Sequence, residues 1–376
     1  MSRSSLRDVQ RLVIKFGSAI VTNDGEGLDR DAINGWVSQI SELLSQGKEV
    51  VLVSSGAIVE GISRLGWNSR PSSIHDLQAA AAVGQMGLIQ AYESSFLQFN
   101  RKTAQILLDH DDVANRQRYL NARGVLKRLI GLGAVPIVNE NDTVATDEIR
   151  FGDNDSLAAL VANLIDADLL IILTDKDGLY DANPDLEPSA QLVSNASADD
   201  NKLDILAGKS NSQMGRGGMV TKLQAARIAS KSGCSTLIAG GRNEKILLRI
   251  IEGEEVGSLL FANQKPLAAR KQWLSGQLQV KGQLILDSGA AEVLVKHGRS
   301  LLPVGITDVF GHFSQGDLLS CVNPLGHEIA RGLANYSSEE IKMIKGIGTG
   351  AVSEILGYQG HTEVIHRDNL VITGLA

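Results

Sequence analysis

Short apolar runs alternate with longer amphipathic segments from about residue 11 to residue 262, and this alternation constrains the fold more than any other feature of the chain. The longer segments carry apolar residues at helical spacing, as in residues 33–44 and 157–165. Strands joined by helices pair in parallel, and strands that are apolar throughout belong to a sheet covered on both faces. We therefore predict a three-layer α/β/α sandwich with a mainly parallel sheet, whose strands are Leu12–Phe16, Val50–Ser54, Ala104–Leu108, Val135–Asn139, Leu169–Thr174 and Ser235–Ala239.

The pattern changes near residue 262. Residues 263–274 begin with the polar and proline content of a linker. Beyond them the chain breaks into short runs separated by Gly or Pro, which are GQLQVKG, GAAEVLVKHG, LLPVGITDVFG, GDLLSCVNPLG and HEIARGLANY. Such runs predict a small β-barrel. The predicted organisation is an α/β domain at 1–262, a linker at 263–274, and a β-domain with a C-terminal extension at 275–376.

Charge and hydropathy exclude several classes of protein. The formal net charge of the 376 residues is −7, which disfavours general binding to nucleic acid because a phosphate backbone selects basic surfaces. The apolar run at Leu12–Ile14 is too short for a signal peptide, and no window reaches the roughly 18 apolar residues that a membrane span needs. We expect a cytoplasmic protein without a membrane anchor.

Two early turns carry groups that suit an anionic ligand. Lys15 stands at the carboxyl end of the first strand, followed by Gly17 and Ser18, and open α/β sheets bind ligands at that edge. Alone, it equally fits a lysine that extends from the strand end into solvent. The second turn, at residues 54–57, contains small residues that let a ligand approach the backbone. Alone, that turn is better explained as an ordinary tight connection.

A denser polar cluster follows in PIVNENDTVAT, residues 136–146, and GDND, residues 152–155. Asn154 or a neighbouring Asp could simply cap the helix predicted at Ser156–Ala167. Asp142, Asp153, Asn154 and Asp155 together exceed what capping needs.

Two further segments lie at the same predicted edge of the sheet, one at the end of a strand and the other at the start of a helix. The apolar strand before Thr174 and Asp175 leads into a glycine turn. The segment GRGGMVTK, residues 215–222, opens a helix with Lys222 in its first turns, so that backbone amides and the helix dipole favour an anion. The chain contains neither a GxxxxGK[ST] loop nor a paired GxGxxG. Two lysines, several carboxylates and amide-rich turns at one edge suit phosphoryl transfer.

Six ordered motifs, KFGS, SSGA, NENDTVAT, GDND, LTDKDGLY and GGMVTK, resemble those of the amino acid kinase family across residues 11–262. The set is most similar to members that phosphorylate the side-chain carboxylate of glutamate, and residues 275–358 resemble a PUA domain. The resemblance implies ATP-dependent formation of glutamyl 5-phosphate, the first step of proline biosynthesis. It also implies feedback inhibition by proline and a homo-oligomer, a dimer or a tetramer, formed through the kinase domain.

The resemblance also implies a role for each site residue. Lys15 and Lys222 would contact the transferred phosphate, and Asp155 would orient both lysines by charge pairing. The glutamate-binding positions would be Ser55, Asp142 and Asn154. ATP would be held by Lys15, Thr174, Asp175, Arg216, Gly217, Gly218, Met219, Val220, Thr221 and Lys222. Arg216 stands where many members have threonine, so its role is open.

The chemistry is consistent with these residue types. A carboxylate with an ordinary pKa of about 4.3 is already a nucleophile at neutral pH, so no general base is needed. The reaction instead requires relief of repulsion between a carboxylate and a triphosphate, which the lysines and a Mg²⁺ ion that accompanies ATP supply. We predict no metal-binding side chains.

Two alternatives remain at the level of the sequence. One is a related kinase that acts on N-acetylglutamate, aspartate, carbamate or a nucleoside monophosphate. The other is an RNA-binding protein that uses its C-terminal domain, which is disfavoured because residues 271–376 contain 8 Lys+Arg and 10 Asp+Glu, a net charge of 8 − 10 = −2.

Overall fold

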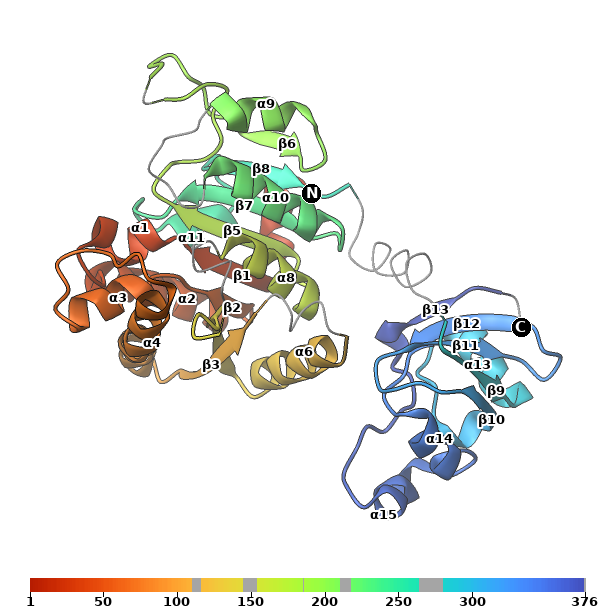
Figure 1. The fold of residues 1–376 in the computed structure, drawn as a ribbon. Helices are drawn as coiled ribbons and strands as arrows, with labels where there is room; N and C mark the ends of the chain where they lie inside the picture. The colour runs from red at the N-terminus through yellow and green to blue at the C-terminus, as the bar shows by residue number, and fades with distance from the viewer. Residues whose placement is uncertain (110–115, 145–153, 185, 210–217, 264–279, 375–376) are drawn as a thin grey trace. The chain divides into compact units, whose positions relative to one another are not determined.

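The computed structural model describes residues 1–109, 116–144, 154–184, 186–209, 218–263 and 280–374, and its contacts divide the chain into two compact units, Met1–Pro266 and Leu267–Ala376 (Figure 1). Of the predicted linker at 263–274, all but residue 263 lies outside the described residues.

An eight-stranded sheet forms the centre of the N-terminal unit, with the strand order β3-β4-β2-β1-β5-β7-β8-β6. Every neighbouring pair is parallel except β7 and β8. The prediction of a mainly parallel sheet is confirmed. The strands are β1 (Arg11–Phe16), β2 (Glu49–Val53), β3 (Lys102–Leu108), β4 (Ala134–Glu140), β5 (Leu169–Thr174), β6 (Asn195–Ser197), β7 (Ser235–Gly240) and β8 (Ser258–Phe261).

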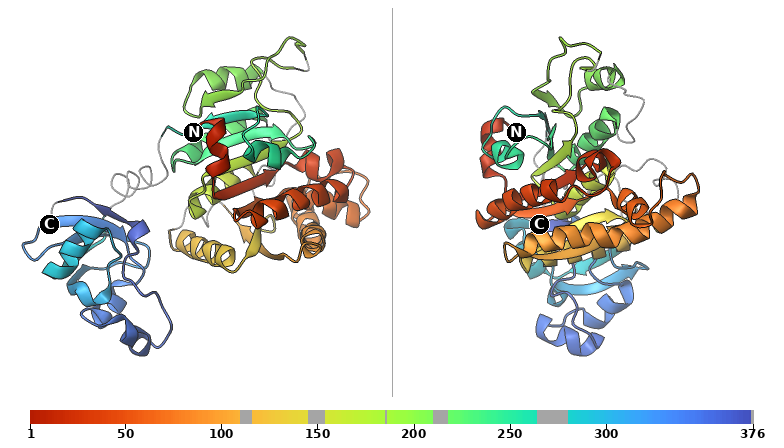
Figure 2. Two further views of the ribbon diagram at one scale, coloured as in Figure 1. Left: turned by 180° about the vertical axis from the view of Figure 1, so that it is seen from behind. Right: turned by 90° about the vertical axis from the view of Figure 1, so that its left-hand side faces the viewer.

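Helices cover both faces of this sheet, so the three-layer architecture is also confirmed (Figure 2). On one face α2 (Arg30–Ser45), α4 (Ile74–Leu97) and α11 (Ile246–Ile251) pack into a core with alternate strand residues. On the other face α6 (Arg116–Gly131), α8 (Asp155–Ile165) and α10 (Met219–Ser230) do the same. All six residues of β5 are buried, because a central strand between two helical layers has no solvent face.

The strand order brings the polar turns together. β4, β2, β1 and β5 are consecutive neighbours and parallel, so their carboxyl ends lie side by side. The short α1 (Ser18–Val21) follows β1, and α3 (Ala57–Arg64) follows β2. The amide of Gly17 donates to the carbonyl oxygen of Leu173 at 2.9 Å, which ties the turn after β1 to the end of β5.

The strands β6 and β8 were not predicted. They are three and four residues long, and β8 is antiparallel to β7. Elements this short leave no periodic pattern over a sequence window. The helix α9 (Lys202–Lys209) lies in the same part of the chain.

The C-terminal unit contains a five-stranded sheet with the order β10-β9-β11-β12-β13. Its own apolar core includes residues from the sheet and from α13 and α14. The elements are β9 (Gly282–Leu286), α13 (Ser288–His297), β10 (Ile306–Gly311), β11 (Leu318–Val322), β12 (Glu328–Leu333), α14 (Ser338–Ile344), α15 (Val352–Leu356) and β13 (Leu370–Ile372).

One of the short runs in this unit was assigned to the wrong type of structure. The run GAAEVLVKHG, at 289–298, was counted among the β-type segments but forms most of α13. The Asp287 side chain accepts a hydrogen bond from the amide of Ala290 and caps the helix start. Ala291 and Leu294 are buried one helical turn apart, and Gly298 ends the helix in the left-handed region.

No helix in the part of the chain that the structure describes combines the length and the apolar character needed to cross a membrane.

Candidate active site

Two lysines and one aspartate meet at the carboxyl edge of the large sheet. The Lys15 ammonium lies 2.6 Å from Oδ1 of Asp155, and the Lys222 ammonium lies 3.1 Å from Oδ2 of the same carboxylate. Lys15 is 3% exposed, Asp155 is 0% exposed and Lys222 is 5% exposed, so solvent screens these charges weakly. Two ammonium groups and one carboxylate give the cluster a net charge of +1, fixed at an edge where a ligand can approach.

The start of α10 reinforces this positive field. Thr221 Oγ1 lies 2.9 Å from Asp155 Oδ2 and 2.8 Å from the Gly218 carbonyl oxygen, so that the first turn of α10 is joined to Asp155. Met219 and Val220 are the first two residues of the helix, whose free N-terminal amides and dipole favour an anion. Arg216 and Gly217 lie outside the described residues.

Asn154 belongs to a chain of hydrogen-bonded side-chain amides. Its Nδ2 donates to the Ser54 carbonyl oxygen and, at 2.7 Å, to Oδ1 of Asn139. Asn139 Nδ2 in turn donates to Oε1 of Gln85 at 2.7 Å. Asn154 occupies the N-cap position of α8, yet its side chain makes no capping hydrogen bond. Its side chain therefore joins the ends of two strands, which the capping interpretation did not anticipate.

Ser55 and Asp142 are the two other residues predicted to bind glutamate. Ser55 Oγ is buried and makes no hydrogen bond to any of the described residues. Such a hydroxyl is costly to bury unless something else satisfies it. Burial raises the pKa of the Asp142 carboxyl to about 6, while the charge of Arg70 acts in the opposite direction. Asp153 lies outside the described residues.

Thr174 ends β5 and Asp175 follows it, directly beside the turn after β1. Thr174 Oγ1 donates to Asp175 Oδ1 at 2.9 Å, and the Thr174 carbonyl oxygen accepts from the Gly241 amide at 2.8 Å. Further along this turn, Asp177 Oδ1 accepts from Asn243 Nδ2 at 2.9 Å. Hydrogen bonds within the protein thus hold the turn on two strands, β5 and β7.

Five of the predicted site residues therefore lie together. Lys15, Asp155, Lys222 and Thr221 form one contact cluster, and Asn154 is the covalent neighbour of Asp155. The sequence did not identify Asn139 or Gln85. Asn139 carried a usable signal, because it is the last residue of the predicted strand Val135–Asn139 and the first residue of the NENDTVAT motif. Gln85 carried none, because it lies within the long helix α4.

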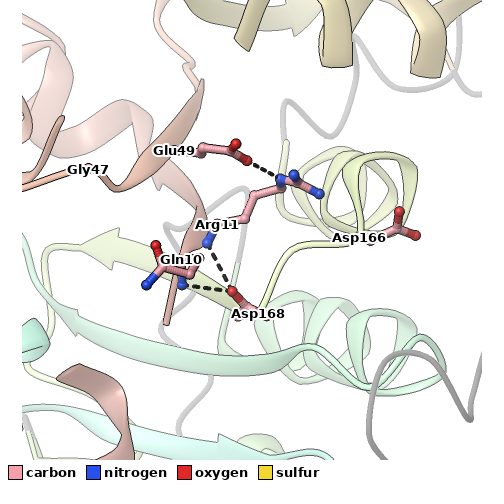
Figure 3. Close-up of a pocket in the computed structure, with 6 residues that line it drawn as sticks. All are labelled: Gln10, Arg11, Gly47, Glu49, Asp166 and Asp168. Atoms are coloured by element: carbon pink, nitrogen blue, oxygen red, sulfur yellow. Dashed lines mark hydrogen bonds and ion pairs between the residues drawn. The ribbon is translucent and has the colours of Figure 1, made fainter. Parts of the chain in front are cut away.

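The opposite edge of the sheet carries a separate polar cluster. Gln10, Arg11, Glu49 and Asp168 line a cavity of about 350 Å³ at the starts of β1, β2 and β5 (Figure 3). Asp168 accepts from the amides of Gln10 and Arg11 at 2.8 and 2.9 Å. These bonds fix the starts of adjacent strands, and parallel sheets bind substrates at the other edge.

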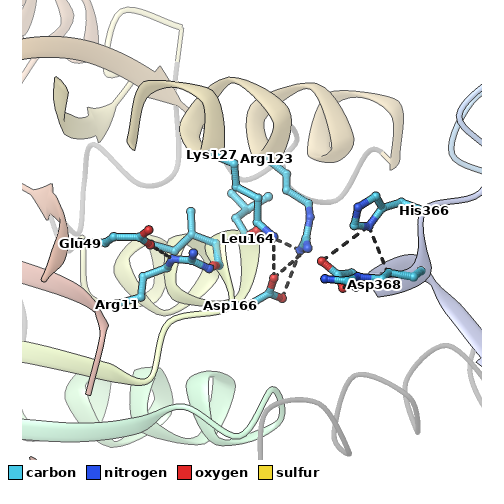
Figure 4. A network of polar contacts seen from close by, with 10 residues as sticks. Arg11, Glu49, Arg123, Lys127, Leu164, Asp166, His366 and Asp368 are labelled. Atoms are coloured by element: carbon cyan, nitrogen blue, oxygen red, sulfur yellow. Dashed lines mark hydrogen bonds and ion pairs between the residues drawn. The ribbon is translucent and has the colours of Figure 1, made fainter. Parts of the chain in front are cut away.

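The same edge anchors α6. Arg123 and Lys127 both contact Asp166, at 2.7 and 2.8 Å (Figure 4). Asp166 ends α8 with a φ of 55°, so this network ties α6 to the far end of the helix that begins with Asp155. Among the described residues, no group of three or more His, Cys, Asp or Glu side chains could hold a metal ion.

Comparison with known proteins gives consistent results. Residues 10–240 match the model of the amino acid kinase family, and residues 282–356 match that of the PUA domain. The chain is 56% identical over 371 residues to the glutamate 5-kinase of Chromohalobacter salexigens, covering 99% of this chain and 98% of that protein. It is 57% identical over 371 residues to the glutamate 5-kinase of Thioalkalivibrio sulfidiphilus, covering 99% of each. With the glutamate 5-kinase of Methylococcus capsulatus the identity is 55% over 372 residues, covering 99% of this chain and 100% of that protein.

Proposed function

The chain belongs to the amino acid kinase family, and we propose from this that it transfers the γ-phosphoryl group of ATP to the side-chain carboxylate of glutamate. The product is glutamyl 5-phosphate, the first intermediate of proline biosynthesis. The observation that carries the proposal is the buried Lys15–Asp155–Lys222 cluster at the start of α10, beside the Asn154 amide chain. The high identity to glutamate 5-kinases over nearly the whole chain favours glutamate over other acceptors.

The reaction follows from the charges of the cluster. A glutamate carboxylate oxygen attacks the γ-phosphorus, the new O–P bond forms, and the bond to the β,γ-bridging oxygen breaks as ADP leaves with its electron pair. Negative charge accumulates on the oxygens around phosphorus, and preorganised cations there lower the barrier. Lys15 and Lys222 are those cations, and Asp155 is the positioning residue that holds both.

The remaining predicted residues would bind the two substrates. Ser55, Asp142 and Asn154 would recognise glutamate, with the Asp142 carboxylate paired to the substrate ammonium. The turn at Thr174–Asp175 and the start of α10 would hold ATP. Mg²⁺ would enter with ATP on its phosphate oxygens, since this ion is commonly bound through substrate phosphates. The kinase domain at 1–262 would contain every catalytic group.

An acceptor assay tests the function. We expect ATP- and Mg²⁺-dependent turnover with glutamate, detected by trapping the acyl phosphate with hydroxylamine. N-acetylglutamate and aspartate should give at most a small fraction of that rate, because the first lacks the ammonium that Asp142 would pair with. Turnover with either compound at the rate seen with glutamate would contradict the proposal.

The pKa of Asp142 predicts a pH dependence of glutamate binding. An acid with a pKa of about 6 is ionised above that pH and neutral below it. Between pH 7.5 and 5.5 the ionised fraction falls about fourfold, so the KM for glutamate should rise about fourfold. The substrate side chain, with a pKa of about 4.3, stays mostly ionised in this range. The measurement is the KM for glutamate across this range.

Asp142→Asn is the matched control for this profile. It should show a high KM for glutamate that no longer changes between pH 7.5 and 5.5, with an ATP KM close to that of the unaltered protein. A variant that keeps the full pH dependence would assign the titration to another group.

Regulation and assembly belong to the same proposal. We propose that proline inhibits at the glutamate site, as the family resemblance implies, and that the protein acts in the cytoplasm. We also propose that a second copy of the chain packs on the kinase domain. Two features support this: β3 is an edge strand, and the apolar side chains of Met86 and Leu97 on α4 are 71% and 60% exposed.

A further inference from the structure

The amide chain that begins at Asn154 has a fixed polarity. A backbone carbonyl only accepts hydrogen bonds, so the atom of Asn154 next to the Ser54 carbonyl oxygen must be Nδ2. The same nitrogen also faces Asn139, whose near atom must therefore be the acceptor Oδ1. Asn139 then presents its Nδ2 to Gln85, whose near atom must be Oε1. The Gln85 Nε2 at the end of the chain is consequently a donor.

This terminal donor is buried and has no hydrogen-bond partner in the part of the chain that the structure describes. Its other amide atom is already held by Asn139, so Gln85 cannot rotate to satisfy Nε2 without losing that bond. A buried donor left in this state costs free energy unless an acceptor arrives from outside the chain. Ser55 Oγ is a second buried polar atom that has no hydrogen-bond partner among the described residues.

Two glycines place Gln85 beside the turn that precedes α3. A Cβ added at Gly84 would lie 1.8 Å from the Ala57 carbonyl oxygen, and one added at Gly61 would lie 1.7 Å from that of Ala80. The backbones of α3 and α4 are thus in direct contact. Ala57 begins α3, two residues after Ser55, and Gln85 follows Gly84 on α4. The Gln85 side chain thus contacts Asn139 near the end of β4, and the preceding Gly84 packs on the start of α3, two residues after Ser55.

We propose that Gln85 Nε2 donates a hydrogen bond to the α-carboxylate of the bound amino acid. This inference rests on the proposed function, and it adds a residue that determines substrate specificity. Asn154 adjoins Asp155 at the phosphoryl end of the site, whereas Gln85 is two hydrogen bonds further along the chain of amides. The reacting γ-carboxylate belongs at the lysine end, so the α-carboxylate faces Gln85.

Gln85→Glu tests this assignment sharply. The introduced carboxylate can still accept from Asn139, so the amide chain is kept and only its terminal donor becomes an acceptor. The KM for glutamate should rise roughly ten- to a hundredfold at pH 8, and the KM for ATP should stay nearly constant. Gln90→Glu, at an exposed position of the same helix, is the matched control and should change neither constant.

A substrate analogue provides a second measurement, the preference between two substrates, which would not change if Gln85 had only a structural role. Isoglutamine has a carboxamide in place of the α-carboxylate and keeps the reacting γ-carboxylate. Gln85→Glu should shift the ratio of kcat/KM for glutamate over isoglutamine toward isoglutamine, because the new acceptor can bind the carboxamide NH2. Gln85→Met, which removes the donor without adding an acceptor, should raise the KM for glutamate without that shift in preference.

Two results would overturn the inference while leaving the proposed function intact. In the first, the unaltered protein is active with glutamate, and the KM values of Gln85→Glu and Gln85→Met for glutamate stay within about twofold of the unaltered protein's KM. The other is a parallel rise in both KM values with a lowered melting temperature, which would make Gln85 a structural residue. Failure of the unaltered protein to turn over glutamate would instead reject the proposed function.

Discussion

Replacing Lys222 with Met is expected to lower kcat by roughly 10²- to 10³-fold, the usual effect of removing one preorganised group that stabilises the transition state. The Lys222 ammonium is buried and lies 3.1 Å from Asp155, so its position is set before ATP binds. Methionine keeps the apolar part of the side chain and removes only the charge. The KM for glutamate should change little, because the charge that Lys222 stabilises develops in the transition state. Steady-state kinetics with both substrates varied provide the measurement.

Lys231→Met is the control for this variant. Lys231 follows the last residue of the same helix and is exposed, so its replacement should leave kcat and both KM values unchanged. A Lys222→Met protein that keeps nearly full kcat would remove Lys222 from the mechanism. A variant with normal kcat and a much higher KM for ATP would make it a binding residue only.

The arrangement of the sheet was accessible from sequence because its signal is local and repeated. The predicted strand Leu169–Thr174 has the observed bounds, and the other five predicted strands lie within two residues of the observed ones at each end. Continuous apolar runs identify a strand between two helical layers, and parallel order places their ends at one edge. Lys15 and Thr174 could be placed together on these grounds alone. Their roles, like those of the other site residues, stay predictions.

What the sequence could not supply depends on contacts between distant segments. Gly61 and Gly84 look like residues that weaken helices, and only the packed structure shows that they bring α3 and α4 into backbone contact. The role proposed for Gln85 depends on that contact. It also depends on the direction of the hydrogen bonds along the amide chain, which the Ser54 carbonyl oxygen fixes through Asn154. Neither effect has a periodic pattern in the chain.

Replacing Asp155 with Asn should damage both stability and catalysis. The carboxylate is fully buried and contacts the ammonium groups of Lys15 and Lys222. Asparagine has nearly the same shape, but it leaves two buried cations facing a neutral amide, and the charge of the cluster rises from +1 to +2. Removing one partner of a buried ion pair typically costs about 3–5 kcal/mol. We expect a loss of that size in urea denaturation.

The same change should reduce kcat at least as much as the loss of one lysine, because both ammonium groups lose their common anchor. The surface variant Asp204→Asn is the matched control for the ion pair. Asp204 contacts Arg227 at 2.8 Å but is 55% exposed, so its replacement should change the stability very little and leave kcat unchanged.

A double variant separates the electrostatic cause from a packing defect. In Asp155→Asn combined with Lys222→Met, one cation is removed along with the carboxylate, and the charge of the cluster returns to +1. If repulsion between the two lysines causes the loss, the double variant should be more stable than Asp155→Asn alone, with strongly non-additive free energies of unfolding. Catalysis should not recover, since a transition-state cation is missing. Additive losses of stability would show that the two lysines do not interact through Asp155, and the central assumption about this site would then be wrong.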